Sequence, residues 1–171
     1  MLNTNNMLKW LWLSGLVVVL DLGSKGIATH YLMLHQPVPV FPGFNWTLAH
    51  NPGAAFSFLS DESGWQRWFF SVIALAVSIG ITIWIKKLNA SQTLLAIALA
   101  LVLGGAIGNL WDRVTLGYVV DFIDVYYQQY HWPAFNIADS AICVGAVMLV
   151  IDSFRGEHNA DEDKDTKIET K

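Results

Sequence analysis

The chain has 171 residues, of which 54% are hydrophobic and only 14% are charged. Soluble domains usually carry about 25% charged residues, so this composition excludes an ordinary soluble protein and indicates one membrane-embedded domain. The formal net charge of −4 comes mostly from the acidic last residues of the chain. The rest of the chain is close to neutral, which argues against a nucleic-acid partner.

Four segments are apolar and long enough to cross a membrane as helices, since a crossing needs about 20 residues. They are predicted at residues 9–27, 68–85, 93–110 and 136–154. No convincing cleavage site follows the first, so this helix is expected to be retained and not removed as a secretory signal. The predicted fold is all-α, with one four-helix membrane domain over residues 1–155 and a disordered acidic tail over residues 156–171.

Basic residues flank these spans unevenly. Lys9 precedes the first span, Lys86 and Lys87 follow the second, and Arg155 follows the fourth. Because basic residues favour the cytoplasmic side of a membrane, both termini are predicted to be cytoplasmic. Two loops, at about residues 29–66 and 111–135, then lie on the outer side.

The first span carries two charges, which are costly inside a membrane and are often functional there. Asp21 and Lys25 are four residues apart, so on a helix they share a face and can form an ion pair. In one interpretation the charged ends of the pair reach the lipid headgroups. In the other, the pair has a structural or positioning role beside an active site. The sequence leaves both open.

The first outer loop contains NWTLAHN, in which apolar and polar residues partly alternate, so short strands are predicted there. An extended segment at the membrane surface is one way to present backbone groups to a peptide. Asn51, Pro52 and Gly53 follow as a strong turn signal, and the plainer interpretation of these three residues is a turn with no further role.

Histidine and cysteine do not point to a metal site. His30, His35, His50 and His131 are predicted on the outer side, but no two have the close helical spacing of zinc ligands. The single cysteine, Cys143, lies in an apolar run and is interpreted as a small packing residue. The sequence therefore predicts neither a metal nor a cofactor.

The third span ends in a polar cluster. Asn109, Asp112 and Arg113 are spaced three and four residues apart, so they line one side of a helix where it meets the outer surface. Arg113 alone is explained by the preference of helix C-termini for a cation. An amide, a carboxylate and a guanidinium together also form a clamp for a peptide carbonyl or a charged headgroup.

Two further aspartates, Asp121 and Asp139, lie on either side of a short outer excursion. Asp139 follows Asn136, a favoured N-cap residue, and the helix dipole stabilises a carboxylate in this first turn. Capping does not explain Asp121, which lies 18 residues earlier. Two facing carboxylates share one proton, so one acts as general base on a water while the other polarises a carbonyl. This is aspartic protease chemistry, and Asp124 is expected to face another direction.

Five blocks of the sequence resemble the motifs of bacterial lipoprotein signal peptidases, the type II signal peptidases, in order and spacing. The blocks are DLGSK (21–25), NPGAAFSFL (51–59), GGAIGNLWDR (104–113), VVDF (119–122) and FNIADS (135–140). The resemblance covers about residues 8–155. One departure is Leu22, which stands where the family often has Gln; we expect it to alter local hydrogen bonding near Asp21 and not the chemistry.

The resemblance implies an intramembrane aspartic endopeptidase of the bacterial inner membrane. It would remove the signal peptide from prolipoproteins by hydrolysing the bond before a diacylglyceryl-modified cysteine. By motif, the catalytic pair is Asp121 and Asp139. Residues that match substrate-binding or supporting positions are Asn51, Gly53, Asn109, Asp112, Arg113, Asn136, Asp21 and Lys25.

The resemblance also implies the surroundings of the site. The first outer loop would form a small periplasmic β-rich cradle that clamps the extended substrate, with the second outer loop over the active site near the periplasmic face. Apolar grooves between the helices would take the acyl chains of the lipid. The cyclic peptide globomycin is the expected inhibitor, and the enzyme is expected to work as a monomer.

Three alternatives make different predictions. A small transporter or channel subunit would distribute its carboxylates through the depth of the membrane. A membrane scaffold would tolerate replacement of Asp139 by Asn. A metal-dependent enzyme would be abolished by chelators.

Overall fold

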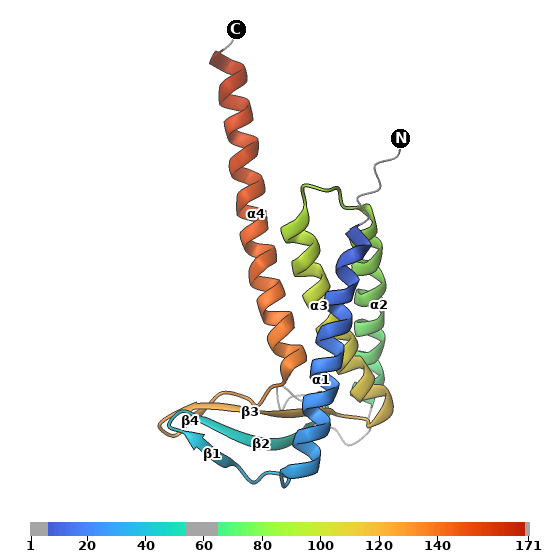
Figure 1. The fold of residues 1–171 in the computed structure, drawn as a ribbon, viewed down its shortest axis with the longest axis vertical. Coiled ribbons are helices and arrows are strands. Elements are labelled where there is room, and N and C mark those ends of the chain that lie inside the picture. Colours follow the sequence, from blue (N-terminus) through green and yellow to red (C-terminus); the bar gives the residue numbers. More distant parts are fainter. Residues whose placement is uncertain (1–6, 54–64, 170–171) are drawn as a thin grey trace.

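The computed structural model describes residues 7–53 and 65–169 of the chain. It contains four long helices and a small sheet at one end of them (Figure 1). All four predicted spans are confirmed as helices that are long and apolar enough to cross a membrane. The helices are α1 (Leu11–Tyr31), preceded by the short 3-10 helix η1 (Met7–Trp10), α2 (Trp65–Lys87), α3 (Thr93–Thr115) and α4 (Ile137–Glu169).

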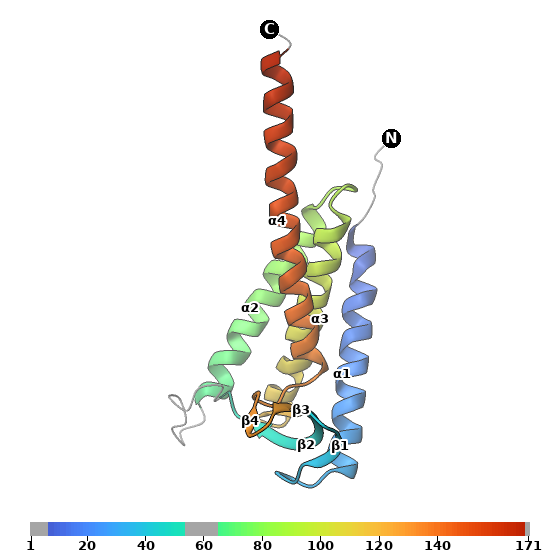
Figure 2. The same ribbon diagram turned by 90° about the vertical axis from the view of Figure 1, so that its left-hand side faces the viewer.

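Helix α3 is the centre of the bundle. It contacts α1, α2 and α4, and Figure 2 shows α1 and α2 on opposite sides of it. In the 18-residue apolar stretch of each span, 61% of the residues are buried for α3, 28% for the first span and 11% for the last. The other helices therefore expose apolar side chains such as Val72 and Val147 around the bundle, as lipid-facing surfaces require.

Glycines allow α3 to approach its neighbours closely. A Cβ atom at Gly104 would lie 2.7 Å from Cβ of Val17 on α1, and one at Gly105 would collide with the carbonyl oxygen of Ala138 on α4. Small residues at helix interfaces permit such approach in membranes, where packing drives helix association. The contact at Gly105 places the first turn of α4 directly against α3.

The sheet joins the two segments of the chain that were predicted as outer loops. It is antiparallel, in the order β1-β2-β3-β4. The strands are β1 (Val38–Phe41), β2 (Phe44–Asn51), β3 (Val119–Tyr127) and β4 (Tyr130–His131). The predicted strand over NWTLAHN is confirmed within β2. The segment predicted only as a second outer loop contributes β3 to the same sheet, so the two predicted outer loops form one structure.

Helix α4 is longer than its predicted span. Its backbone is helical to Glu169, and it extends beyond the other helices at the end opposite the sheet (Figures 1 and 2). The predicted acidic tail, residues 156–171, begins within this helix, and the disorder predicted for the tail stays a prediction.

Candidate active site

The first turn of α4 is built by Asn136 and Asp139. The side-chain Oδ1 of Asn136 accepts a hydrogen bond from the backbone N–H of Asp139 at 2.9 Å, and the backbone N–H of Asn136 donates to Oδ2 of Asp139 at 3.3 Å. This reciprocal pair is a capping box in which Asp139 takes the place of the usual Glu or Gln. The predicted N-cap is therefore present, and it sets the position of the Asp139 carboxylate.

Asp121 lies in β3 and is only 2% exposed. Its carboxylate accepts a hydrogen bond from Nδ2 of Asn136 at 2.7 Å and another from Nδ2 of Asn51 at 3.1 Å. Asn51 ends β2, which pairs with β3 so that Asn51 lies opposite Val119. Pairing of the two strands therefore brings Asn51 to Asp121 across 70 residues of sequence.

Asn109, on α3, connects the two carboxylates. Its Nδ2 donates to Oδ1 of Asp139 at 2.7 Å, while its own Oδ1 accepts from Nδ2 of Asn136 at 3.2 Å. Because Asn136 also donates to Asp121, a continuous chain of hydrogen bonds runs from Asp121 through two amides to Asp139. The structure thus brings together the two predicted catalytic aspartates and the three predicted asparagines.

The two carboxylates influence each other electrostatically. Burial, and secondarily the charge of Asp139, raise the pKa of Asp121 from its ordinary value to about 7, although the bonds from Asn51 and Asn136 oppose this shift. Burial penalises the charged form of a carboxyl group, and a nearby negative charge adds to the penalty. Burial and the neighbouring charge therefore shift the Asp121 carboxyl group toward its protonated form.

Arg113 is the cation next to this pair. Its guanidinium interacts electrostatically with Asp139 and Asp121, and Nη1 donates to the backbone oxygen of Asn109 at 3.3 Å. The guanidinium carbon lies 5.5 Å from the ring centre of Phe70 on α2. Phe70 could not be predicted from the sequence, because the sequence does not distinguish an aromatic residue that faces the site from one that faces lipid.

Gly53 secures the turn that carries Asn51. Its backbone N–H donates to Oδ1 of Asn51 at 2.9 Å, which confirms the predicted turn. Gly53 has φ of +103°, and a Cβ there would lie 2.7 Å from the Phe70 ring. Residues 54–59 of the same sequence block lie outside the described residues.

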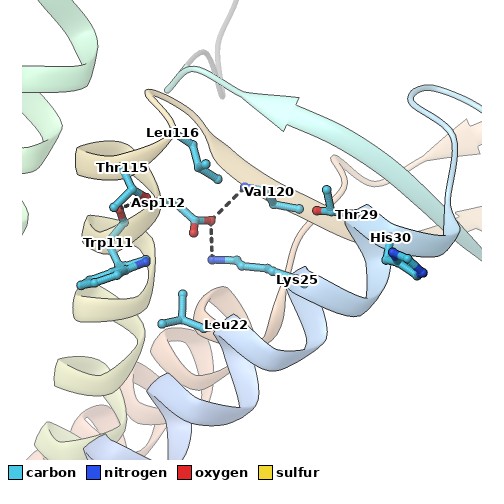
Figure 3. A pocket seen from close by; sticks show the side chains of 10 residues that line it. Leu22, Lys25, Thr29, His30, Trp111, Asp112, Thr115, Leu116 and Val120 are labelled. Atoms are coloured by element: carbon cyan, nitrogen blue, oxygen red, sulfur yellow. Dashed lines mark hydrogen bonds and ion pairs between the residues drawn. The ribbon is translucent and has the colours of Figure 1, made fainter.

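Next to the network that joins Asp121 and Asp139, Lys25 lies among three polar groups. Its Nζ is 2.7 Å from Oδ2 of Asp21 and 2.9 Å from Oδ2 of Asp112, and it donates to Oδ1 of Asn109 at 3.0 Å (Figure 3 shows the pair with Asp112). Asp21 and Lys25 are 0% and 3% exposed, so the interpretation of a pair that reaches the headgroups is wrong.

Asp21 and Asp112, the two carboxylates beside Lys25, also accept hydrogen bonds from backbone groups of the site. Oδ1 of Asp21 accepts from the N–H of Ala138 in the first turn of α4 at 2.9 Å, and Oδ2 of Asp112 accepts from the N–H of Val120 in β3 at 3.0 Å. Ala138 and Val120 each precede one of the two aspartates of the pair. Asp21 and Asp112 therefore support the segments that carry Asp139 and Asp121.

A cavity of about 480 Å³ opens beside this ion pair, between α1 and α3 (Figure 3). Leu22 lines it together with Trp111 and Thr29. Leu22, the predicted departure from the family pattern, therefore forms part of the wall of this cavity. The side-chain oxygens of Asp21 accept hydrogen bonds from Lys25 and from the N–H of Ala138, and neither bond involves residue 22.

Asp124 belongs to a different cluster. Three residues separate it from Asp121 along β3, so the two side chains point to opposite faces of the sheet, as expected. Asp124 accepts a hydrogen bond from Nδ2 of Asn45 at 2.7 Å and contacts Nδ1 of His131 at 2.8 Å. It therefore ties β2, β3 and β4 together.

The remaining predicted histidines do not gather into a site. His50 stacks on Tyr118 with 3.9 Å between ring centres, and burial, followed by the charge of His35, lowers the pKa of His50. Among residues 7–53 and 65–154, no group of three or more His, Cys, Asp or Glu side chains has an arrangement that could hold a metal ion.

Residues 13–155 match the family described as signal peptidase (SPase) II. The chain is also 56% identical over 155 residues to the lipoprotein signal peptidase of Teredinibacter turnerae, with 91% of this chain and 92% of that protein covered. The chain belongs to the lipoprotein signal peptidase family. A second lipoprotein signal peptidase, from Acinetobacter baumannii, is 59% identical over 145 residues, covering 85% of this chain and 82% of that protein.

Solved structures agree with this family assignment. Two bacterial membrane enzymes, solved by the in meso method at 2.3 Å and 1.9 Å resolution, superpose with TM-scores of 0.78 and 0.75. They share 31% and 32% sequence identity with this chain, covering 88% and 84% of it and 90% and 91% of their own lengths. This member of the family is thus a multi-pass membrane peptidase, as the sequence analysis predicted.

Family membership decides against two of the three alternatives. It supports removal of signal peptides from prolipoproteins, and it disfavours a channel subunit or a scaffold. The carboxylates agree with this choice, because Asp21, Asp112, Asp121 and Asp139 converge at the sheet end of the bundle and are not distributed along the spans.

Proposed function

We propose that the chain is an aspartic endopeptidase that hydrolyses the peptide bond before the diacylglyceryl-modified cysteine of prolipoproteins. The observation that carries this proposal is the single hydrogen-bond network that joins the buried Asp121 to Asp139. Two coupled carboxylates with different surroundings are what general acid–base hydrolysis requires.

In this mechanism Asp139 is the ionised member of the pair. It lies at the N-terminus of α4, where the helix dipole favours a negative charge, and it accepts hydrogen bonds from Asn109 and from the N–H of Asn136. Arg113 adds a positive charge nearby. Asp121, which is almost fully buried, is the protonated member.

The reaction then proceeds in two balanced steps. Asp139 takes a proton from water as the water oxygen bonds to the scissile carbonyl carbon, and Asp121 gives its proton to the carbonyl oxygen. The resulting diol collapses when Asp139 returns its proton to the leaving nitrogen and the C–N bond breaks. Asp121 recovers a proton from one hydroxyl, which leaves a carboxylic acid and an amine and restores both aspartates.

The position of the site fits a lipid-modified substrate. The pair lies where the helices meet the sheet, and this end of the bundle would be at the periplasmic surface of the bacterial inner membrane, with both chain termini cytoplasmic. The sheet would hold the extended peptide, and apolar grooves between the helices would take the acyl chains. The enzyme would act as a monomer, and globomycin would block the pair.

The test is to incubate the purified protein in detergent with a prolipoprotein carrying a diacylglyceryl cysteine and with excess EDTA. Mass spectrometry is expected to show cleavage immediately before the modified cysteine, no cleavage of the unmodified precursor, and inhibition by globomycin. Cleavage at another bond would contradict the proposed position. Cleavage that EDTA abolishes and added metal restores would contradict the aspartic mechanism.

A further inference from the structure

Lys25 makes one contact that a simple ion pair would not need. Besides Asp21 and Asp112, its Nζ donates to Oδ1 of Asn109, 84 residues away in sequence, at 3.0 Å. Lys25 is 3% exposed, and none of these partners is a member of the pair Asp121 and Asp139. The third contact connects the buried charge cluster to the amide that bonds to Asp139.

This contact determines which way the Asn109 amide faces. An amide side chain has one acceptor oxygen and one donor NH₂ group. If the Asn109 amide were reversed, its NH₂ would face the ammonium of Lys25 and its oxygen would face the carboxylate of Asp139. Both contacts would be repulsive. Asn136 also donates to the Asn109 oxygen, at 3.2 Å, but a bond from a charged donor is about twice as strong as one from a neutral donor.

Lys25 also acts on the backbone next to Asp139. Its partner Asp21 accepts from the N–H of Ala138 with the oxygen that Lys25 does not use. A Cβ at Gly108 would lie 2.5 Å from that Asp21 carboxylate, so α3 leaves little space for it to shift. Lys25 therefore restrains both the side-chain partner of Asp139 and the turn that carries it.

We propose that Lys25 is a positioning residue that orients the Asn109 amide, so that Nδ2 of Asn109 stays on Asp139 and keeps this carboxylate aligned to take a proton from water. The inference rests on the proposed function. Lys25 would affect the rate of the chemical step, and it would do so by holding Asn109 in place.

The test is a double-mutant cycle between Lys25 and Asn109 with the diacylglyceryl prolipoprotein as substrate. Since Lys25→Met alone would leave two buried carboxylates without their cation, Asp112→Asn is included in every protein of the cycle. Lys25→Met is expected to lower kcat by about 10- to 100-fold while KM changes by less than about two-fold. In an Asn109→Leu background the same change is expected to have almost no further effect.

A second variant does not disturb Lys25. Asn109→Asp keeps an acceptor for the lysine but removes the N–H that Asp139 receives and places a second carboxylate against Asp139, so both a low kcat and a lower thermal midpoint are expected. Activity in Asn109→Asp would contradict the inference, because Asp139 would then not need the N–H of Asn109. Lys9→Met, at an exposed lysine at the other end of the first span, is the control for loss of a lysine.

Three results would overturn the inference: equal losses of kcat from Lys25→Met in both backgrounds, a loss that appears only in KM, or an active Asn109→Asp protein. Failure of the proposed function gives a different pattern. In that case, folded protein with the native residues at all these positions would not cleave the substrate.

Discussion

At the scale of single residues, the site depends on three asparagines with fixed amide orientations. The side-chain oxygens of Asn51, Asn109 and Asn136 accept from the N–H of Gly53, from Lys25 and from the N–H of Asp139, respectively. The NH₂ groups of the same residues donate to Asp121 or Asp139. Each amide thus presents a donor to a carboxylate, which is the arrangement that the proposed mechanism requires.

The raised pKa of Asp121 predicts how activity depends on pH. If Asp121 acts as the protonated member, its proton is present below its pKa and is lost as the pH rises through about 7. The value of kcat/KM, measured between about pH 5 and pH 9, is therefore expected to fall above about pH 7. A rate that keeps rising to the alkaline end of this range would contradict the assignment of Asp121 as the acid.

The sequence pointed to these residues but not to the hydrogen bonds that connect them. Asp121 and Asp139 could be paired because a capping role explains only one of them. The hydrogen bonds through Asn109 and Asn136 could not be predicted, because amide orientation depends on neighbours that fold in from α1 and α3. For the same reason, the choice between the two interpretations of Asp21 and Lys25 needed the structure.

At the scale of elements, the position of Asp139 depends on close packing between α3 and α4. Gly105→Ala would place a Cβ against the backbone carbonyl of Ala138, which cannot move without displacing the first turn of α4. We expect about a 100-fold loss of kcat, because a shift of about 1 Å in a catalytic group costs this much. Steady-state kinetics of the purified variant would measure it.

The matched control for this variant is Gly80→Ala on α2, where nothing lies within 4 Å of the added Cβ. Gly80→Ala is expected to leave kcat unchanged. Equal activities for the two variants would mean that α4 tolerates displacement at Gly105, and the structural account of Asp139 would then be incorrect.

Sequence patterns predicted the helices well and the sheet only in part. Long apolar runs identify spans because a single segment can satisfy its own backbone groups in lipid only as a helix. The run VVDFIDVYY is rich in β-branched and aromatic residues, which favour strands, but its partner β2 lies about 70 residues earlier. Such distant pairing is not visible in a local pattern.

At the scale of the whole molecule, the proposed orientation in the membrane predicts which residues are accessible from outside. In a Cys143→Ser background, Gln129→Cys in the turn before β4 is expected to react with a membrane-impermeant maleimide added to spheroplasts. Ser91→Cys, between α2 and α3, is expected to react only after the membrane is opened. Both positions are exposed in the structure. The reverse pattern would invert the proposed topology.

This orientation was predicted from the distribution of lysine and arginine. The fold alone does not reveal which end of the bundle faces the cytoplasm. The arrangement of the helices and the sheet also explains why the four carboxylates of the site lie at one end of the bundle. The helices bring Asp21, Asp112 and Asp139 to the end where β3 carries Asp121. A bond at the membrane surface is therefore within reach of a site built mainly on membrane helices.

The most direct test of the central claim compares cleavage of a diacylglyceryl prolipoprotein by the wild type and by Asp121→Asn, Asp139→Asn and Asp124→Asn. The account predicts background rates for the first two variants, because each removes one carboxylate of the pair. Asp124→Asn is predicted to retain substantial activity, since Asp124 bonds to Asn45 and His131 on the other face of the sheet. Loss of activity in Asp124→Asn alone, or activity in either of the other two variants, would contradict the account.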